Sequence, residues 1–192
     1  MSLTNQEKGV LLLGARESIK TLFSDIPEPA LNFQYYPNLL KPYGAFVTLK
    51  KSNELRGCIG YITSEEPLFN TVCEVARLAA SEDPRFRPVT EEEVTNILIE
   101  ISVLSLPEPI GDYEEIVIGK HGLLLDDENA QAVLLPQVAV EQKWGIAEFL
   151  SGICQKANLP SNLWMKQPLN LRSFTAEVFG EQRRYDLTKE RR

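Results

Sequence analysis

Histidine and cysteine are scarce in this 192-residue sequence, which has one histidine, His121, and three cysteines, Cys58, Cys73 and Cys154. None of the cysteines forms a Cys-x-x-Cys pair, and their odd number leaves at least one unpaired within the chain. Disulfide frameworks and structural zinc sites need more of these residues at closer spacing. We therefore expect no metal site, no disulfide scaffold and no bound cofactor.

Long apolar runs and an excess of positive charge are also absent. No run approaches the roughly 18 residues of a membrane-spanning helix, and the net charge is −7. Non-specific nucleic-acid binding depends on Lys and Arg that neutralise phosphates. The first residues lack the pattern of a secretory signal. We therefore expect a cytoplasmic protein with no membrane span and no general affinity for nucleic acid.

Hydrophobic residues make up 43% of the chain, which is enough for one substantial core or two small ones. Their periodicity predicts helices over 5–23, 64–81 and 145–157 and strands over 44–51, 55–62, 97–104, 115–118, 123–125, 132–135 and 172–178. Thr4 with Glu7, and Thr90 with Glu93, have the spacing of helix capping boxes. The element order suggests two related halves, about 1–106 and 107–192, within one domain.

The segment Leu55-Arg56-Gly57-Cys58-Ile59-Gly60 is the strongest chemical signal. Two glycines inside a strand indicate a bend, a bulge or a close approach of another group. Alternation along a strand places Arg56, Cys58 and Gly60 on one face, with Arg56 and Cys58 about 7 Å apart at Cα. A nearby arginine stabilises a thiolate, so the segment is a candidate reactive-cysteine site. The alternative is a small hydrophobic side chain in a core strand.

The loop from Asp83 to Pro88 is a candidate second wall for this site. It carries Arg85 and Phe86 between two prolines, which restrict its backbone. Such loops present arginines to anions, or they are salt-bridged connectors. If Arg56 and Arg85 face one cleft, an acid must separate them, and Asp83 and Glu100 are the candidates. We predict on this basis that Arg56→Ala weakens function more than folding.

Two residues are candidate general bases for Cys58. His121 is the only imidazole and lies in the turn Gly119-Lys120-His121-Gly122. Glu100 would serve if its strand neighbours the Cys58 strand. The alternative for His121 is a capping or solvent-exposed residue of the turn. The alternative for Glu100 is a residue on a solvated face of its strand.

Three functions remain open from the residues. The first is an enzyme that uses Cys58. The second is a binding module in which Gly57, Gly60, Arg56, Asp83, Arg85 and Phe86 form a cleft for an anionic group. The third is a scaffold for a partner protein, in which the segment serves only the fold.

The sequence resembles the AMMECR-type domain family over residues 5 to 185. The resemblance is carried by Leu55 to Gly60, Asp83 to Phe86 with Pro88, Ser102 to Leu104, Gly119 to Gly122, and Leu134 to Val138 ahead of Trp144, Phe149 and Leu150. It implies an α+β fold with a barrel-like, mostly antiparallel sheet flanked by helices. It implies no established reaction, and an association with Memo-like and radical-SAM proteins.

Overall fold

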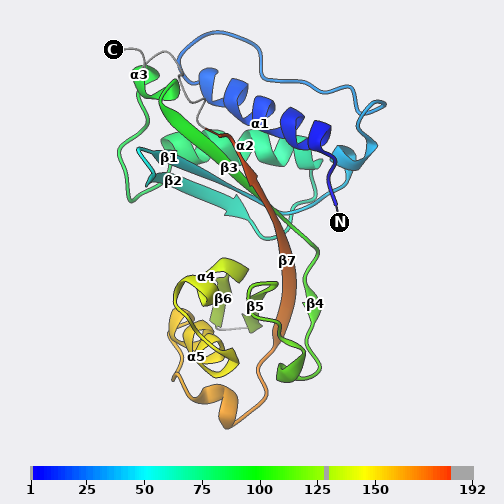
Figure 1. The fold of residues 1–192 in the computed structure, drawn as a ribbon, viewed down its shortest axis with the longest axis vertical. Helices are drawn as coiled ribbons and strands as arrows, with labels where there is room; N and C mark the ends of the chain where they lie inside the picture. Colours follow the sequence, from blue (N-terminus) through cyan, green and yellow to red (C-terminus); the bar gives the residue numbers. More distant parts are fainter. Residues whose placement is uncertain (1, 128–129, 183–192) are drawn as a thin grey trace, which may run out of the picture. The chain divides into compact units, whose positions relative to one another are not determined.

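The computed structural model describes residues 2–127 and 130–182, which form two compact units. Of these described residues, the first unit contains 2–103 and 178–182, and the second contains 104–127 and 130–177. Strand β7 (Leu171–Gly180) leaves the second unit and ends in the first (Figure 1). The description below takes each unit by itself.

The first unit is a sheet covered by helices on one face. Its strands are β1 (Ala45–Lys51), β2 (Glu54–Tyr61) and β3 (Ile97–Leu104), and its helices are α1 (Asn5–Lys20), η1 (Pro37–Leu40), α2 (Leu68–Ser81) and α3 (Glu91–Val94). β1 lies between β2 and β3 and is antiparallel to both. α2 packs on β1 and β2, and α1 packs on α2 (Figure 1). β2 is therefore the edge strand of this sheet.

Helix α2 supplies the apolar layer against the sheet. Its residues Val72, Val75, Ala76 and Ala79 are buried, as their helical spacing predicts. They share one core cluster with Val47, Leu49, Ile99 and Ile101 of the strands, which alternate with polar residues along β1 and β3. Burial of these side chains holds α2 on the sheet.

The hairpin between β1 and β2 confirms the strand pairing expected for the cysteine segment. Ser52 and Asn53 join the strands with φ angles of 54° and 69°. Positive φ at both central residues characterises the type I′ turn, whose twist matches that of the strands. The pairing places Thr48 directly opposite Cys58.

The second unit has its own sheet and core. Its elements are β4 (Glu108–Pro109), η2 (Tyr113–Glu115), β5 (His121–Asp127), β6 (Ala130–Leu134), α4 (Pro136–Glu141), α5 (Ile146–Lys156), η3 (Leu163–Met165) and β7. β5 pairs with β6 and β7, and β4 pairs with β7, all antiparallel. The buried face of α5, with Phe149, Leu150 and Ile153, joins Leu123 and Leu125 in one cluster. The predicted helix over 145–157 is thereby confirmed.

The strand expected over 115–118 is wrong. Asp112 accepts a hydrogen bond from the backbone N–H of Glu114 and caps the short helix η2 there. The chain then turns, and the backbone N–H groups of Lys120 and His121 both donate to the carbonyl of Val117. The local pairing with β7 is made instead by Glu108 and Pro109. The apolar residues that follow the Asp112 cap, Ile116 and Val117, thus lead into a turn and do not pair in a β-sheet.

The predicted α+β class, an antiparallel sheet flanked by helices, is confirmed. Both predicted capping boxes are present, with Thr4 and Glu7 at α1 and Thr90 and Glu93 at α3. Over the part of the chain that the structure describes, no helix has both the length and the apolar character needed to cross a membrane.

Candidate functional site

Cys58 lies on the face of β2 opposite helix α2. Its neighbour Gly57 is buried, and a Cβ atom on Gly57 would lie 2.2 Å from the backbone oxygen of Ala79 in α2. Successive side chains of a strand point to opposite faces. The Cys58 side chain therefore points away from α2, where it is half-buried.

The thiol has one hydroxyl neighbour on the adjacent strand. Thr48 Oγ1 donates a hydrogen bond to Cys58 Sγ at 3.3 Å. Thr48 is also paired with Glu100 on β3, so Cys58, Thr48 and Glu100 follow one line across three strands. This line is the polar face of the first unit's sheet.

The backbone of Cys58 is held by the loop that follows α2. Asp83 Oδ2 accepts a hydrogen bond from Cys58 N–H at 2.8 Å, and Arg85 Nη2 donates to the Cys58 carbonyl at 3.2 Å. Because β2 is an edge strand, these two backbone groups have no partner strand. The loop satisfies both groups and brings Arg85 to the cysteine.

Asp83 and Arg85 form a bidentate ion pair. Arg85 Nε and Nη2 donate to Asp83 Oδ1 and Oδ2 at 2.9 and 2.7 Å. These hydrogen bonds hold the pKa of the Asp83 carboxyl well below its usual range, against the opposing effect of burial. The pKa of Arg85 is raised, first by Asp83 and to a lesser extent by the neighbouring Cys58 side chain.

The two members of this pair differ sharply in exposure. The Asp83 side chain is 3% exposed and the Arg85 side chain 54% exposed. The carboxylate is thus turned inward and the guanidinium outward, over the ring of Phe86 at 5.6 Å. The solvent-facing end of the pair is positive.

Arg56 has a different environment from the one expected. Its Nε and Nη2 donate to the two carboxylate oxygens of Glu93 at 3.2 and 2.9 Å, and Nη1 and Nη2 donate to the carbonyls of Arg87 and Pro88. Arg56, first among other donors, lowers the pKa of Glu93 to about 2. Arg56 therefore fastens the loop to β2, and Arg85 is the guanidinium that contacts Cys58.

Glu93 was missed as a partner of the candidate site. Its capping-box position was visible in the sequence, and its Oε2 accepts a hydrogen bond from Thr90 N–H at 3.1 Å. The same carboxylate also binds Lys51 Nζ at 2.8 Å. The capping box predicts the local role of Glu93, but its ion pair with Arg56 depends on how β2 and α3 pack and has no signal in the sequence.

Each of the two candidate bases has a hydrogen-bond partner within its own unit. Glu100 is two strands from Cys58, which corresponds to about 10 Å between Cα atoms, and its carboxylate binds Lys50 Nζ at 2.8 Å. His121 belongs to the second unit, where its Nδ1 accepts a hydrogen bond from Val117 N–H at 3.2 Å. The neutral ring then carries its proton on Nε2, so that nitrogen is a donor rather than a base.

Both glycines of the segment have a packing explanation. A Cβ on Gly60 would lie 2.3 Å from the backbone oxygen of Ala45 and 2.4 Å from Cγ of Phe46. Gly57 is similarly constrained by Ala79. Gly57 and Gly60 therefore allow close approach of neighbouring protein atoms, and their presence does not require a ligand.

Comparison with known proteins identifies the family. A protein of Pyrococcus furiosus is 43% identical over 156 residues, covering 76% of this chain and 74% of the relative. A protein of Methanosarcina barkeri is 37% identical over 93% of this chain and 92% of its own. The crystal structure of an uncharacterized protein from Pyrococcus horikoshii, 35% identical, matches with a TM-score of 0.84 over 94% of both chains. The AMMECR1 family model matches residues 12–179, and the chain belongs to the AMMECR1 family.

Proposed function

We propose that this AMMECR1-family domain binds a small anionic molecule at a site centred on Cys58 and Arg85, with the Cys58 thiol as the reactive group. The observation that carries the proposal is the outward guanidinium of Arg85, which contacts the cysteine while its counter-ion Asp83 is buried. An outward arginine suits a carboxylate or phosphate. The half-buried Cys58 thiol lies beside this guanidinium, whereas Cys73 and Cys154 are buried, so Cys58 is the thiol that a bound molecule can reach.

The site offers a guanidinium, a thiol and an aromatic ring to such a ligand. Arg85 Nη1 has no hydrogen-bond partner among the described residues, so its two N–H groups are available. Thr48 holds the thiol by its hydroxyl, and Phe86 lies beside the guanidinium. The cytoplasm, our proposed location, keeps such a thiol reduced.

A second function is favoured by the contacts of Gly57, Gly60 and Arg56. Each of these residues meets a structural need, which supports a domain that docks a partner protein and in which the segment from Leu55 to Gly60 serves the fold. The Memo-like and radical-SAM proteins implied by the sequence resemblance are the proposed partners of that alternative. The two functions differ in whether Cys58 reacts.

We expect Cys58 to be alkylated first when the native protein is treated with iodoacetamide and each cysteine is quantified by mass spectrometry. Burial raises the pKa of Cys73 to about 12 and also raises the pKa of Cys154, so both thiols are protonated and shielded. Labelling of Cys73 or Cys154 before Cys58 would contradict the proposal. Labelling of Cys58 only after unfolding would favour the docking function.

A further inference from the structure

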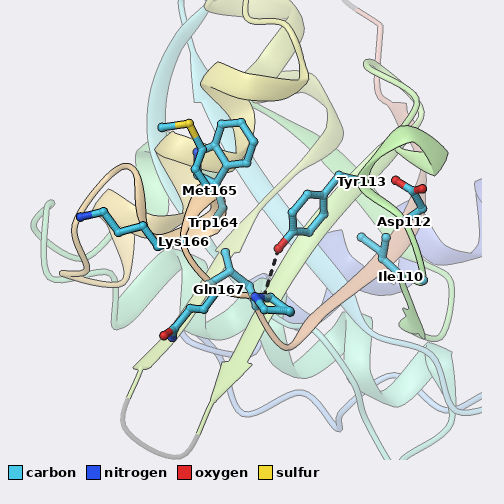
Figure 2. A pocket seen from close by; sticks show the side chains of 10 residues that line it. Ile110, Asp112, Tyr113, Trp164, Met165, Lys166 and Gln167 are labelled. Atoms are coloured by element: carbon cyan, nitrogen blue, oxygen red, sulfur yellow. Dashed lines mark hydrogen bonds between the residues drawn. The ribbon is translucent and has the colours of Figure 1, made fainter.

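A pocket in the second unit lies apart in sequence from the Cys58 segment. It has a volume of about 380 Å³ and is formed by residues 110–113 and 164–169 (Figure 2). Small-molecule sites in proteins have volumes of roughly 300 to 1,000 Å³. The pocket therefore has room for a ligand of about one ring with a substituent.

Two aromatic side chains form the main walls of this pocket. The rings of Tyr113 and Trp164 have centroids 6.1 Å apart and planes inclined by 78°. They meet edge to face, and Ile110 and Leu169 add apolar surface beside them. Two roughly perpendicular aromatic rings favour a planar aromatic ligand, which can stack on one ring while its edge contacts the face of the other.

Both rings are held in place by hydrogen bonds within the second unit. The Tyr113 hydroxyl accepts from Leu169 N–H at 3.0 Å, and the Trp164 indole N–H donates to Ser151 Oγ at 3.1 Å. Figure 2 shows the Tyr113 hydroxyl directed toward the turn that carries Gln167. Because the walls are fixed before a ligand arrives, little side-chain entropy is lost on binding.

The polar groups of the pocket define the ligand further. A tyrosine hydroxyl that accepts one hydrogen bond still has its own hydrogen to donate. The Trp164 N–H is already used by Ser151, and Asp112 already accepts from Glu114 N–H. Lys166 and Gln167 also line the pocket, but both residues are exposed, and Figure 2 shows their side chains directed away from Tyr113. Of the two ring side chains, Tyr113 is therefore the one with an available donor, and a ligand needs an acceptor atom to meet it.

We propose that this pocket binds a small, uncharged, planar aromatic molecule that carries a hydrogen-bond acceptor. Stacking against Trp164 and Tyr113 supplies the apolar contact, and the Tyr113 O–H donates to the acceptor. This site is independent of the anion site proposed at Cys58.

The test uses benzamide, which has a flat ring and a carbonyl acceptor, and cyclohexanecarboxamide, which has the same carbonyl on a puckered ring. The chain has two tryptophans, so two indole N–H signals are followed by NMR and assigned with Trp144→Phe. We expect benzamide to shift the Trp164 signal saturably, with a Kd on the order of 1 mM, and to leave the Trp144 signal unchanged. Tyr113→Phe should weaken binding by roughly 2- to 10-fold while keeping the ring.

Three results would overturn the proposal. The first is no shift of the Trp164 signal up to the solubility limit of benzamide. The second is an equal response to cyclohexanecarboxamide, which would mean that planarity is not recognised. The third is an unchanged affinity in Tyr113→Phe, provided that the rest of its spectrum shows the native fold.

Discussion

Replacing Gly57 with alanine should lower the free energy of unfolding by about 3 kcal/mol. The new Cβ would lie 2.2 Å from the backbone oxygen of Ala79, and a backbone atom inside a packed helix cannot move aside cheaply. Denaturant unfolding of the variant and the parent protein measures the difference.

Gly9→Ala is the matched control for this substitution. Gly9 is exposed in helix α1, and no atom lies within 4 Å of its added Cβ. Alanine there should stabilise the protein by roughly 0.5 to 1 kcal/mol, because glycine is a poor helix former. If Gly57→Ala were as benign as Gly9→Ala, α2 could not pack on β2 as described.

Asp83→Ala should cost about 1 to 3 kcal/mol, which is typical of leaving a shielded backbone N–H without its acceptor, while the exposed Arg85 guanidinium is re-solvated at little further cost. The substitution leaves Arg85 without its counter-ion and the Cys58 N–H without an acceptor. Asp25→Ala serves as the control, because Asp25 is exposed and its removal should change stability by less than about 0.5 kcal/mol. Thermal and denaturant unfolding of both variants provide the comparison.

The same variant changes the pH dependence of stability. The folded-state pKa of Asp83 is below its ordinary value, so the unfolded chain binds its proton first as pH falls. The stabilisation is therefore complete above about pH 5 and is lost as pH falls through the unfolded-state pKa of about 4 toward the folded value. Asp83→Ala should lose less stability than the parent protein over this acid range, and equal losses would contradict the assigned ion pair.

Local sequence signals predicted the elements with strong periodicity. The α2 face, the alternation of β3 and the hairpin at Ser52 and Asn53 all follow from side-chain spacing and turn chemistry. Helix α1 shows the limit of such signals. Helical spacing in the sequence also fits a buried face through Val10, Leu13, Ile19 and Leu22, because an apolar-rich helix offers more than one plausible face. In the structure Leu13 is 61% exposed, and the buried residues are Leu11, Ala15 and Ile19.

The chemistry of the candidate site depended on contacts between distant segments. Sequence spacing placed Arg56 near Cys58, yet Glu93, 37 residues further along the chain, receives its guanidinium. Arg85 reaches Cys58 only because the loop covers the edge of β2, which strand alternation alone cannot predict. The Tyr113–Trp164 pocket joins segments about 50 residues apart and had no local signal.

The most direct test of the account is the ratio of the alkylation rates of Cys58 by iodoacetate and by iodoacetamide. The two reagents transfer groups of similar size, but only iodoacetate is an anion. An outward guanidinium beside the thiol should attract it, and one unit charge at about 4 Å in water is worth about 1 kcal/mol. The ratio should therefore fall by roughly 3- to 5-fold in Arg85→Gln.

Arg56→Gln also removes one positive charge, from the strand that carries Cys58, and provides the control. Arg56 is paired with Glu93 as Arg85 is with Asp83, but the Arg56 side chain is only 16% exposed against 54% for Arg85, so this variant should keep a ratio close to that of the parent protein. Each variant is measured under conditions where circular dichroism shows it folded. A lower ratio in Arg85→Gln alone is the predicted result, and a ratio that Arg85→Gln leaves unchanged would contradict the assignment of an anion site at Cys58.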